Sequence, residues 1–132
     1  MTITVDASVM VAVVLNEPTK PALVRLTEGA ELQSPPSLPW EVGNALSALV
    51  RRERIVQAQA LAALQAFEQI PVRLADIDLG EALLIATSHR IYAYDAFVLE
   101  CARRYRAPLL SLDRRQIEIA AVEEIDILPI DP

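Results

Sequence analysis

The sequence is poor in the residues on which several common kinds of active site depend. Its 132 residues include one histidine, one cysteine and three glycines, and eleven of its twelve basic residues are arginines. The single cysteine, Cys101, excludes an internal disulfide and is expected to be a buried helix residue in a reducing compartment. Zinc sites built from clustered His and Cys side chains are excluded. A glycine-rich phosphate loop is excluded as well, because the glycines lie far apart.

The lone histidine and the lone lysine argue against two further chemistries. His89 stands at the end of an expected helix, and no nucleophile motif accompanies it. A serine or cysteine hydrolase is therefore a weaker interpretation of His89 than a solvated helix terminus. Phospho-aspartate chemistry typically uses a lysine near the reactive acid, and only Lys20 is present. Receiver-like and haloacid-dehalogenase-like interpretations of Asp6 are therefore disfavoured.

The sequence has no apolar run of roughly 20 residues, the length that spans a membrane. Residues 1–6 lack a basic stretch and contain an acid, which is not typical of a signal peptide, so we expect a cytoplasmic protein. Hydrophobic residues make up 53% of the chain, which is enough for a sizeable core. The length suits one domain over residues 1–132.

The net charge of −6 argues against binding of polyanions by overall electrostatics. The arginines are clustered, however, and their planar side chains bind phosphate, or the carboxylates of an acidic partner, through two hydrogen bonds. Solvated helix faces explain each cluster equally well. The candidates for phosphate contacts are Arg51, Arg52, Arg54, Arg114 and Arg115.

Short apolar segments alternate with amphipathic segments, which predicts alternating strands and helices. Strands are expected over residues 3–5, 32–34, 71–74, 109–111 and 125–128. Helices are expected over residues 8–15, 20–28, 39–54, 56–69, 78–89, 95–105 and 114–121. This order is typical of an α/β sandwich built on a short, mainly parallel sheet. The active site of such a sheet lies at the carboxyl ends of its strands.

Four acidic residues stand at junctions between these expected elements. Asp6 follows the first strand and Asp113 follows the strand over residues 109–111, whereas Glu41 and Asp95 stand where helices begin. Each acid taken alone has a simpler explanation, because carboxylates cap helices and favour their N-terminal ends. Four carboxylates at one sheet edge would repel one another, and a hard cation such as Mg²⁺ or Mn²⁺ would relieve that repulsion. Such a cation also activates water for attack on a phosphodiester.

At these positions the sequence resembles a PIN domain, specifically the VapC group of toxins. Residues 5–9 (VDASV) resemble the motif that opens the family, and residues 40–46 (WEVGNAL) resemble its E-x-x-N-A-L helix. Residues 94–96 (YDA) match a third motif. Residues 111–113 (SLD) resemble a T-x-D motif with serine in place of threonine. The motifs follow the family's order and cover nearly the whole chain.

The resemblance implies a PIN-like, Rossmann-like α/β/α sandwich and an endoribonuclease that uses Mg²⁺ or Mn²⁺ to activate water. It implies that the metal-binding acids are Asp6, Glu41, Asp95 and Asp113. It implies that the supporting polar residues are Ser8, Asn44 and Ser111. It further implies the toxin half of a toxin–antitoxin pair, with RNA as substrate, a cognate VapB-like antitoxin as inhibitor and a homodimer as the common assembly.

Two alternative functions keep the same fold. A catalytically silent PIN-like domain would bind RNA or protein without cleavage, and it would be expected to have lost at least one of the four acids. A DNA-directed flap-type nuclease generally needs further acids and insertions that a chain of 132 residues lacks. The apolar stripe over residues 56–69 has two interpretations, a partner surface or ordinary core, and core is slightly favoured.

Overall fold

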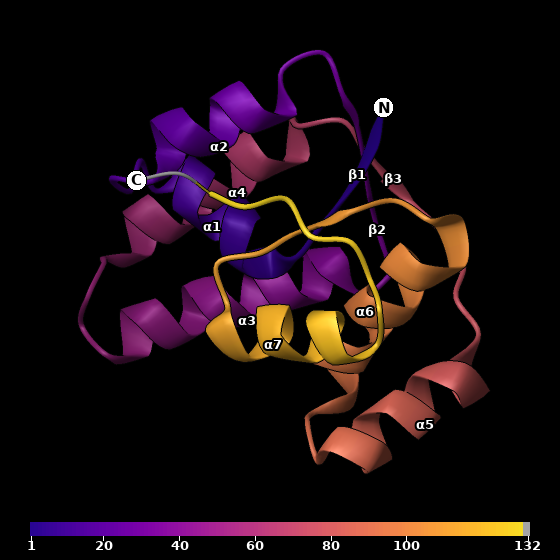
Figure 1. Ribbon diagram of the computed structural model, residues 1–132. Coiled ribbons are helices and arrows are strands. Elements are labelled where there is room, and N and C mark those ends of the chain that lie inside the picture. The colour runs from indigo at the N-terminus through magenta and orange to yellow at the C-terminus, as the bar shows by residue number, and fades with distance from the viewer. Residues whose placement is uncertain (131–132) are drawn as a thin grey trace.

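The computed structural model describes residues 1–130, and its centre is a sheet of four parallel strands (Figure 1). The strands are β1 (Thr2–Val5), β2 (Glu31–Ser34), β3 (Val72–Leu74) and β4 (Leu109–Leu110), in the order β3-β2-β1-β4. In the register of the sheet, Thr4 of β1 pairs with Gln33 of β2 and with Leu109 of β4. The carboxyl ends of all four strands therefore face one edge of the sheet.

Helices connect the strands and cover both faces of the sheet. They are α1 (Ala7–Val14), α2 (Lys20–Thr27), α3 (Leu38–Arg51), α4 (Gln57–Glu68), α5 (Leu79–His89), α6 (Ala93–Tyr105) and α7 (Arg114–Val122). The helices α1, α3 and α4 pack on one another, whereas α6 packs on α5, α7 and β1. The architecture is an α/β/α sandwich, and the expected fold class is confirmed.

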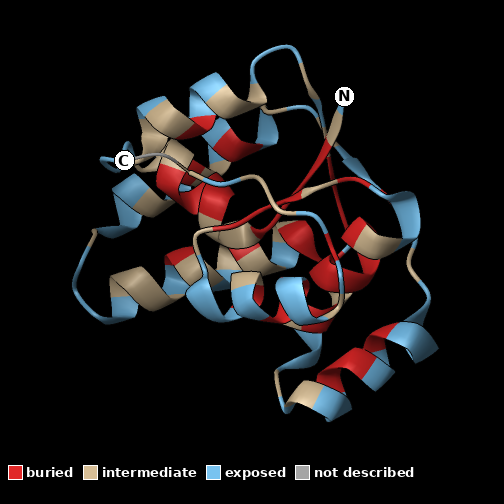
Figure 2. Cartoon of the chain, viewed as in Figure 1, coloured by how far each residue is buried: buried red, intermediate tan, exposed pale blue. Residues whose placement is uncertain are grey.

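The alternation of side chains along β1 and β4 produces two separate apolar cores. Ile3, Val5 and Leu110 belong to the core beneath α1–α4. Leu109, the neighbour of Leu110, belongs to the core beneath α5–α7. Successive residues of a strand point to opposite faces, so two adjacent leucines contribute to both layers. Figure 2 shows this arrangement as buried residues that run through the sheet and along the inward sides of the helices.

The expected strand over residues 125–128 is wrong in extent. Only an isolated parallel bridge forms there, between Leu109 and Ile127. The Leu109 amide donates to the carbonyl of Asp126, and the Leu128 amide donates to the carbonyl of Leu109, each at 2.8 Å. Pro129 follows and has no amide hydrogen to continue the ladder. The strand expected over residues 109–111 is also shorter, because Ser111 leaves the ladder after Leu110.

The helix expected over residues 39–54 ends earlier, at Arg51. Glu53 adopts a positive φ of 57°, a conformation that a right-handed helix does not contain, and the chain turns there toward α4. The helix expected from residue 95 instead begins at Ala93, so Asp95 lies within its first turn.

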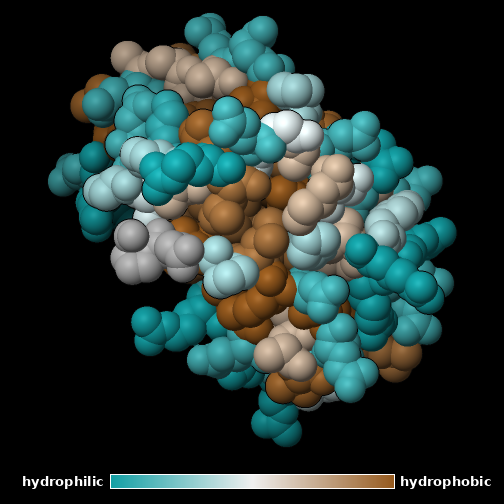
Figure 3. All heavy atoms as spheres, turned by 45° about the horizontal axis from the view of Figure 1, so that its top comes forward, coloured by the Kyte–Doolittle hydropathy of each residue, from teal (hydrophilic) through white to brown (hydrophobic). Residues whose placement is uncertain are grey.

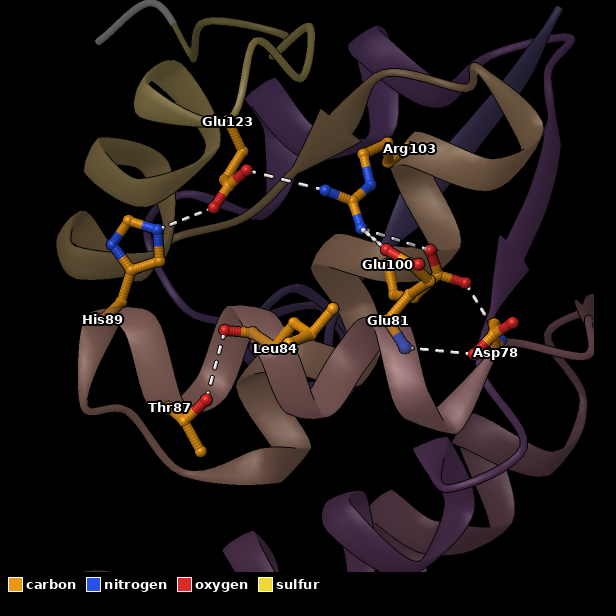
Figure 4. A network of polar contacts seen from close by, with 8 residues as sticks. All are labelled: Asp78, Glu81, Leu84, Thr87, His89, Glu100, Arg103 and Glu123. Atoms are coloured by element: carbon orange, nitrogen blue, oxygen red, sulfur yellow. Dashed lines mark hydrogen bonds and ion pairs between the residues drawn. The ribbon is translucent and has the colours of Figure 1, made fainter.

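A network of charged side chains around Arg103 holds α5 against α6 and α7 (Figure 4). The Arg103 guanidinium lies 3.3 Å from a carboxylate oxygen of Glu81, 3.7 Å from Glu100 and 3.5 Å from Glu123. Glu123 also contacts Nε2 of His89 at 2.8 Å. His89 is therefore half-buried and paired, which corrects its interpretation as a solvated helix end. The network fixes both ends of α5 and hence the segment that leaves it at residue 90.

Cys101 confirms its expected place in the core, because it is fully buried on α6. Burial raises the pKa of its thiol to about 12, so the reactive thiolate form is suppressed.

Part of the large apolar content of the chain reaches the surface. Figure 3 shows apolar residues gathered across the middle of one face, with hydrophilic residues around them. On α5, Leu79, Leu83 and Leu84 are each more than half exposed. Within residues 1–130, none of the helices combines the length and the apolar character needed to cross a bilayer.

A chain of polar side chains crosses the sheet from β3 to β1 and is buried at Gln33 and Thr4. Arg73 donates to Oε1 of Gln33 at 2.9 Å, and Nε2 of Gln33 donates to Oγ1 of Thr4 at 2.9 Å. The Thr4 hydroxyl in turn donates to the carbonyl of Ala107 at 3.1 Å. Thr4 and Gln33 are fully buried, so each hydrogen bond satisfies a group that water cannot reach.

We expect Thr4→Val to lower the free energy of unfolding by about 1–3 kcal/mol, because the Gln33 amide and the Ala107 carbonyl would lose a buried partner. Valine keeps the shape of threonine, so the loss reports the hydroxyl. Urea unfolding measures it. Thr87→Val is the matched control, since Thr87 is exposed and bonds only within its own helix. Equal effects of the two substitutions would contradict the prediction.

Candidate active site

Asp6 lies at the carboxyl end of β1 and is the most deeply buried of the four acids, at 7% exposure. Its Oδ1 accepts hydrogen bonds from Oγ of Ser8 at 2.6 Å and from the amide of Val9 at 3.3 Å, which caps α1. Its Oδ2 accepts from Oγ of Ser111 at 2.5 Å. Burial raises the pKa of Asp6, the three hydrogen bonds lower it, and the charge of Asp113 raises it further. Asp6 thus joins β1, α1 and the end of β4.

Glu41 projects from the first turn of α3 toward the same edge. Its Oε2 accepts a hydrogen bond from Oγ of Ser37 at 2.7 Å, which fixes the carboxylate one turn from the start of the helix. Burial is the largest cause that raises the pKa of Glu41 to about 7, and the charges of Asp95 and Asp6 add to it. The hydrogen bond from Ser37 acts in the opposite direction.

Asp95 lies in the first turn of α6 and is half-buried. Burial raises the pKa of its carboxyl, and the charges of Asp113 and Asp6 raise it further. Its backbone carbonyl accepts a hydrogen bond from Nε2 of the buried Gln116 at 3.1 Å. Through that bond α7 fixes the position of the turn that carries Asp95.

Asp113 is exposed and caps α7, so the helix-capping explanation of this residue holds. Its Oδ1 accepts from the amides of Arg115 at 2.9 Å and Gln116 at 3.3 Å. The charge of Asp113 nevertheless raises the pKa of both Asp6 and Asp95, which places it beside the other acids. The structure therefore brings all four sequence-predicted acids to one edge, with Asp6 interacting with each of the others.

The polar residues expected to support these acids also lie at this edge. Ser8 and Ser111 both donate to Asp6, and the Ser8 hydroxyl accepts from the amide of Leu112 at 3.0 Å. Asn44 is exposed one turn beyond Glu41, and both residues line a cavity at this edge. Ser37 and Gln116 perform similar positioning roles and carried no motif by which the sequence could identify them.

The donor set of this edge fits a hard divalent cation, because every candidate ligand is a carboxylate whose charge is unfavourable beside the others. Within residues 1–130, however, no three Asp, Glu, His or Cys side chains form a group that could hold a metal ion together. Mg²⁺ usually keeps several waters and takes only one or two carboxylates, so an open arrangement of this kind remains suitable.

Two cavities open beside the acids, and Tyr92 and Asp95 line both of them. One, of about 600 Å³, is lined by Trp40, Glu41, Asn44, Tyr92, Tyr94 and Asp95. The other, of about 570 Å³, is lined by Arg90, Ile91, Tyr92, Asp95 and Arg115.

The structure separates the arginines that the sequence offered as phosphate contacts. Arg115 lines the second cavity, beside Asp95. Arg51 lies at the other end of α3 from Glu41, about 15 Å along the helix at 1.5 Å per residue, and Arg52 and Arg54 follow it. Arg90, which was not a candidate, lies at the site. The aromatic residues of the first cavity were missed too, although Trp40 directly precedes Glu41 in the sequence.

Comparison with known proteins gives one family and one fold. A model of the PIN domain matches residues 3–122. No curated protein sequence matches the chain. The structure of PAE2754 from Pyrobaculum aerophilum is 25% identical, with a TM-score of 0.68, and the match covers 90% of this chain and 87% of that one. VapBC2 from Rickettsia felis, solved bound to a DNA fragment from its promoter, has a TM-score of 0.68 at 12% identity, with coverage of 99% and 100%.

We expect the pH dependence of stability to reveal the partly buried carboxyl of Glu41. Its pKa is raised, so the folded state holds a proton that the unfolded chain loses near pH 4.5. In EDTA, this contribution to the free energy of unfolding is complete below pH 4.5 and is lost as the pH rises through about 7. Glu41→Gln should flatten the decrease, which urea unfolding across this range measures. A slope no flatter than that of the control Glu31→Gln, at an exposed position, would contradict the prediction.

Proposed function

The chain belongs to the PIN-domain family, whose model matches residues 3–122, and we propose that it is a Mg²⁺- or Mn²⁺-dependent endoribonuclease. PIN domains are generally nucleases, which makes phosphodiester hydrolysis the expected class of reaction. The observation that carries the proposal is the group of three raised-pKa carboxylates, Asp6, Glu41 and Asp95, at the carboxyl edge of a parallel sheet. We further propose that the chain, expected to be one domain over residues 1–132, is a single PIN domain; residues 131 and 132 lie outside the described residues.

The ion would take one or two carboxylates and complete its shell with water, and the residues that would supply the carboxylates or the neighbouring charge are Asp6, Glu41, Asp95 and Asp113. When bound, such an ion supplies activation of water and polarisation of a phosphoryl oxygen. Asp113 already uses Oδ1 to cap α7, so it would contribute its other oxygen or act through its charge alone. A divalent ion would also offset the repulsion that raises the pKa values of the other three acids.

The protein's own task is to hold these oxygens in place before the substrate arrives. Ser8 and Ser111 fix the two oxygens of Asp6 from opposite sides, and Ser37 fixes Glu41. Such partners keep a carboxylate in one orientation, and their removal typically costs a metal site 10- to 100-fold in affinity or activity. Asn44, in the cavity beside Glu41, would offer an amide to the substrate phosphate or to water.

We also propose that the protein is the toxin half of a toxin–antitoxin pair, inhibited by a VapB-like antitoxin and active as a homodimer in the cytoplasm. A fold shared with the toxin–antitoxin complex VapBC2 supports this assignment. The assignment is supported as well by an apolar cavity of about 440 Å³ between α3 and α4, where a protein partner would bind. The cavity is lined by Leu46, Val50, Leu61 and Leu64. The apolar stripe expected over residues 56–69 serves partly as core and leaves part of its surface for a partner. Ala63 and Phe67 of α4 belong to the core, whereas Leu61 is 57% exposed.

The alternative is a catalytically silent PIN-like domain that binds RNA or protein. All four acids are present, and three of them remain at the unfavourable, partly buried positions described above. A site without catalytic use would gain stability by losing one of them, which favours the nuclease.

We expect purified protein to cleave cellular RNA at discrete sites in Mg²⁺ or Mn²⁺ and not in EDTA. Asp6→Asn and Asp95→Asn should abolish cleavage, and Ser8→Ala should slow it by about 10- to 100-fold, because it removes one hydrogen bond to Asp6. Gel analysis of the RNA measures the rates, with Glu31→Gln as a control that changes an exposed acid on β2. Folded protein that binds RNA but cleaves none with either metal would establish the silent domain instead.

Divalent ions should also stabilise the fold, independently of cleavage. At a concentration about 100 times its Kd, an ion that binds only the folded state adds about 2.7 kcal/mol to the free energy of unfolding. We expect thermal unfolding to show this gain with Mn²⁺ for the wild type and a much smaller gain for Asp6→Asn. Equal gains for both proteins would place the ion elsewhere.

A further inference from the structure

The cavity beside Glu41 and Asp95 has an unusual share of the aromatic side chains. The chain has one tryptophan and three tyrosines, and the tryptophan and two of the tyrosines line this cavity. Trp40 is 73% exposed, Tyr92 83% and Tyr94 52%. None of the three is buried in either core. Their position at the acidic site therefore calls for a ligand with an aromatic face.

The backbone under these rings is held firmly by its neighbours. Trp40 stands in the first turn of α3 between Leu38 and Val42, which are both fully buried. The Tyr94 ring packs edge-on against Phe97, with centroids 5.5 Å apart and an interplanar angle of 81°. Because the backbone that carries these rings is already ordered, only the side-chain torsions remain to be fixed when a flat ligand binds.

The neighbouring cavity has the opposite chemistry, because two arginines line it. Arg115 donates to the carbonyl of His89 at 3.1 Å, which holds its guanidinium over the end of α5. Arg90 directly follows that helix, in a left-handed conformation with a φ of 53°. Both cavities meet at Tyr92 and Asp95, so a positively charged side and an aromatic side flank the same carboxylate.

We propose that Trp40, Tyr92 and Tyr94 form a subsite that stacks an unpaired base of single-stranded RNA, while Arg90 and Arg115 bind an adjacent phosphate. This inference rests on the proposed ribonuclease function and names the substrate class of that site. Bases in a duplex present only their edges, whereas unpaired bases offer the flat faces that aromatic side chains stack on. The RNA strand would pass over Tyr92 and Asp95, which line both cavities, and this path would bring its backbone to the acids.

The arginines favour RNA over a basic protein segment as the occupant. A lysine or arginine side chain would stack on Trp40 and pair with Asp95, but Arg90 and Arg115 would repel the rest of a basic segment. A nucleotide satisfies both halves of the site, because its base is aromatic and its phosphate is an anion.

The single tryptophan allows a direct test. Oligouridylate is titrated into wild-type protein in EDTA, and into Asp6→Asn with Mg²⁺, so that binding is measured without cleavage. We expect Trp40 emission to change with the single strand and not with a duplex of the same length. Unchanged emission with oligouridylate in both arms would overturn the proposal, and a change caused only by a short arginine peptide would assign the cavity to a basic protein partner.

Substitutions then test the aromatic half and the arginine half of the subsite separately, with Kd measured from the fluorescence anisotropy of labelled oligouridylate. Trp40→Ala and Tyr92→Ala should each raise Kd about 5- to 150-fold, the equivalent of ~1–3 kcal/mol for one stacked base. Trp40→Phe should restore most of the affinity. Arg115→Gln should lower the slope of log Kd against log salt by about one. Leu84→Ala, which removes an exposed apolar side chain of α5, is the matched control and should leave Kd unchanged.

The outcome separates this inference from the proposed function. If the protein cleaves RNA and Trp40→Ala and Tyr92→Ala bind and cleave like the wild type, the stacking subsite is wrong and the nuclease stands. If these variants lose affinity while the wild type cleaves nothing, the subsite stands and the nuclease is wrong.

Discussion

The burial of one charged group, the Asp6 carboxylate, is the constraint on which the arrangement of the active edge depends. A carboxylate removed from water must be compensated by hydrogen bonds, because an unpaired buried charge costs several kcal/mol. Ser8, Val9 and Ser111 provide that compensation from α1 and from the end of β4. The same serines accept hydrogen bonds from the amides of Leu112 and Asp113. The turn that leads into α7, and with it Gln116 and the turn of Asp95, is therefore organised around Asp6.

The remaining acids add a cost that the rest of the fold must offset. Burial raises the pKa values of Asp6, Glu41 and Asp95, and the charges of Asp6, Asp95 and Asp113 on neighbouring acids raise them further, so the edge is held together against its own electrostatic repulsion. Two apolar cores and the polar chain from Arg73 to Ala107 stabilise the sheet from either side. Functional sites commonly lower the stability of a fold in this way. The proposed cation would relieve the repulsion between these acids.

The acids could be predicted from the sequence because parallel topology makes the inference simple. A residue after a buried strand, such as Asp6 or Asp113, must reach the carboxyl edge whatever the rest of the chain does. The reduction of the expected strand over residues 125–128 to a single bridge at Ile127 could not be predicted. The extent of pairing there depends on where β4 ends as well as on Pro129. The place of Trp40 and Tyr92 at the site could not be predicted from the sequence for another reason. They lie 52 residues apart in the sequence and carry no periodic pattern, so only the fold, which brings the starts of α3 and α6 to the same cavity, places them together.

The acidity of the protein is in apparent conflict with the proposed binding of RNA, and the distribution of charge resolves this conflict. The net charge of −6 is spread over the whole chain, whereas charges more than about 8 Å apart are largely screened at physiological salt. A phosphate in the second cavity would therefore respond mainly to Arg90, to Arg115 and to the cation proposed to bind at the edge beside Asp95. Stacking on aromatic rings does not depend on charge, so an acidic surface leaves it intact. Such a protein would bind RNA weakly over most of its acidic surface. It would bind a single strand tightly only at the site where the aromatic rings, the arginines and the proposed metal ion act together.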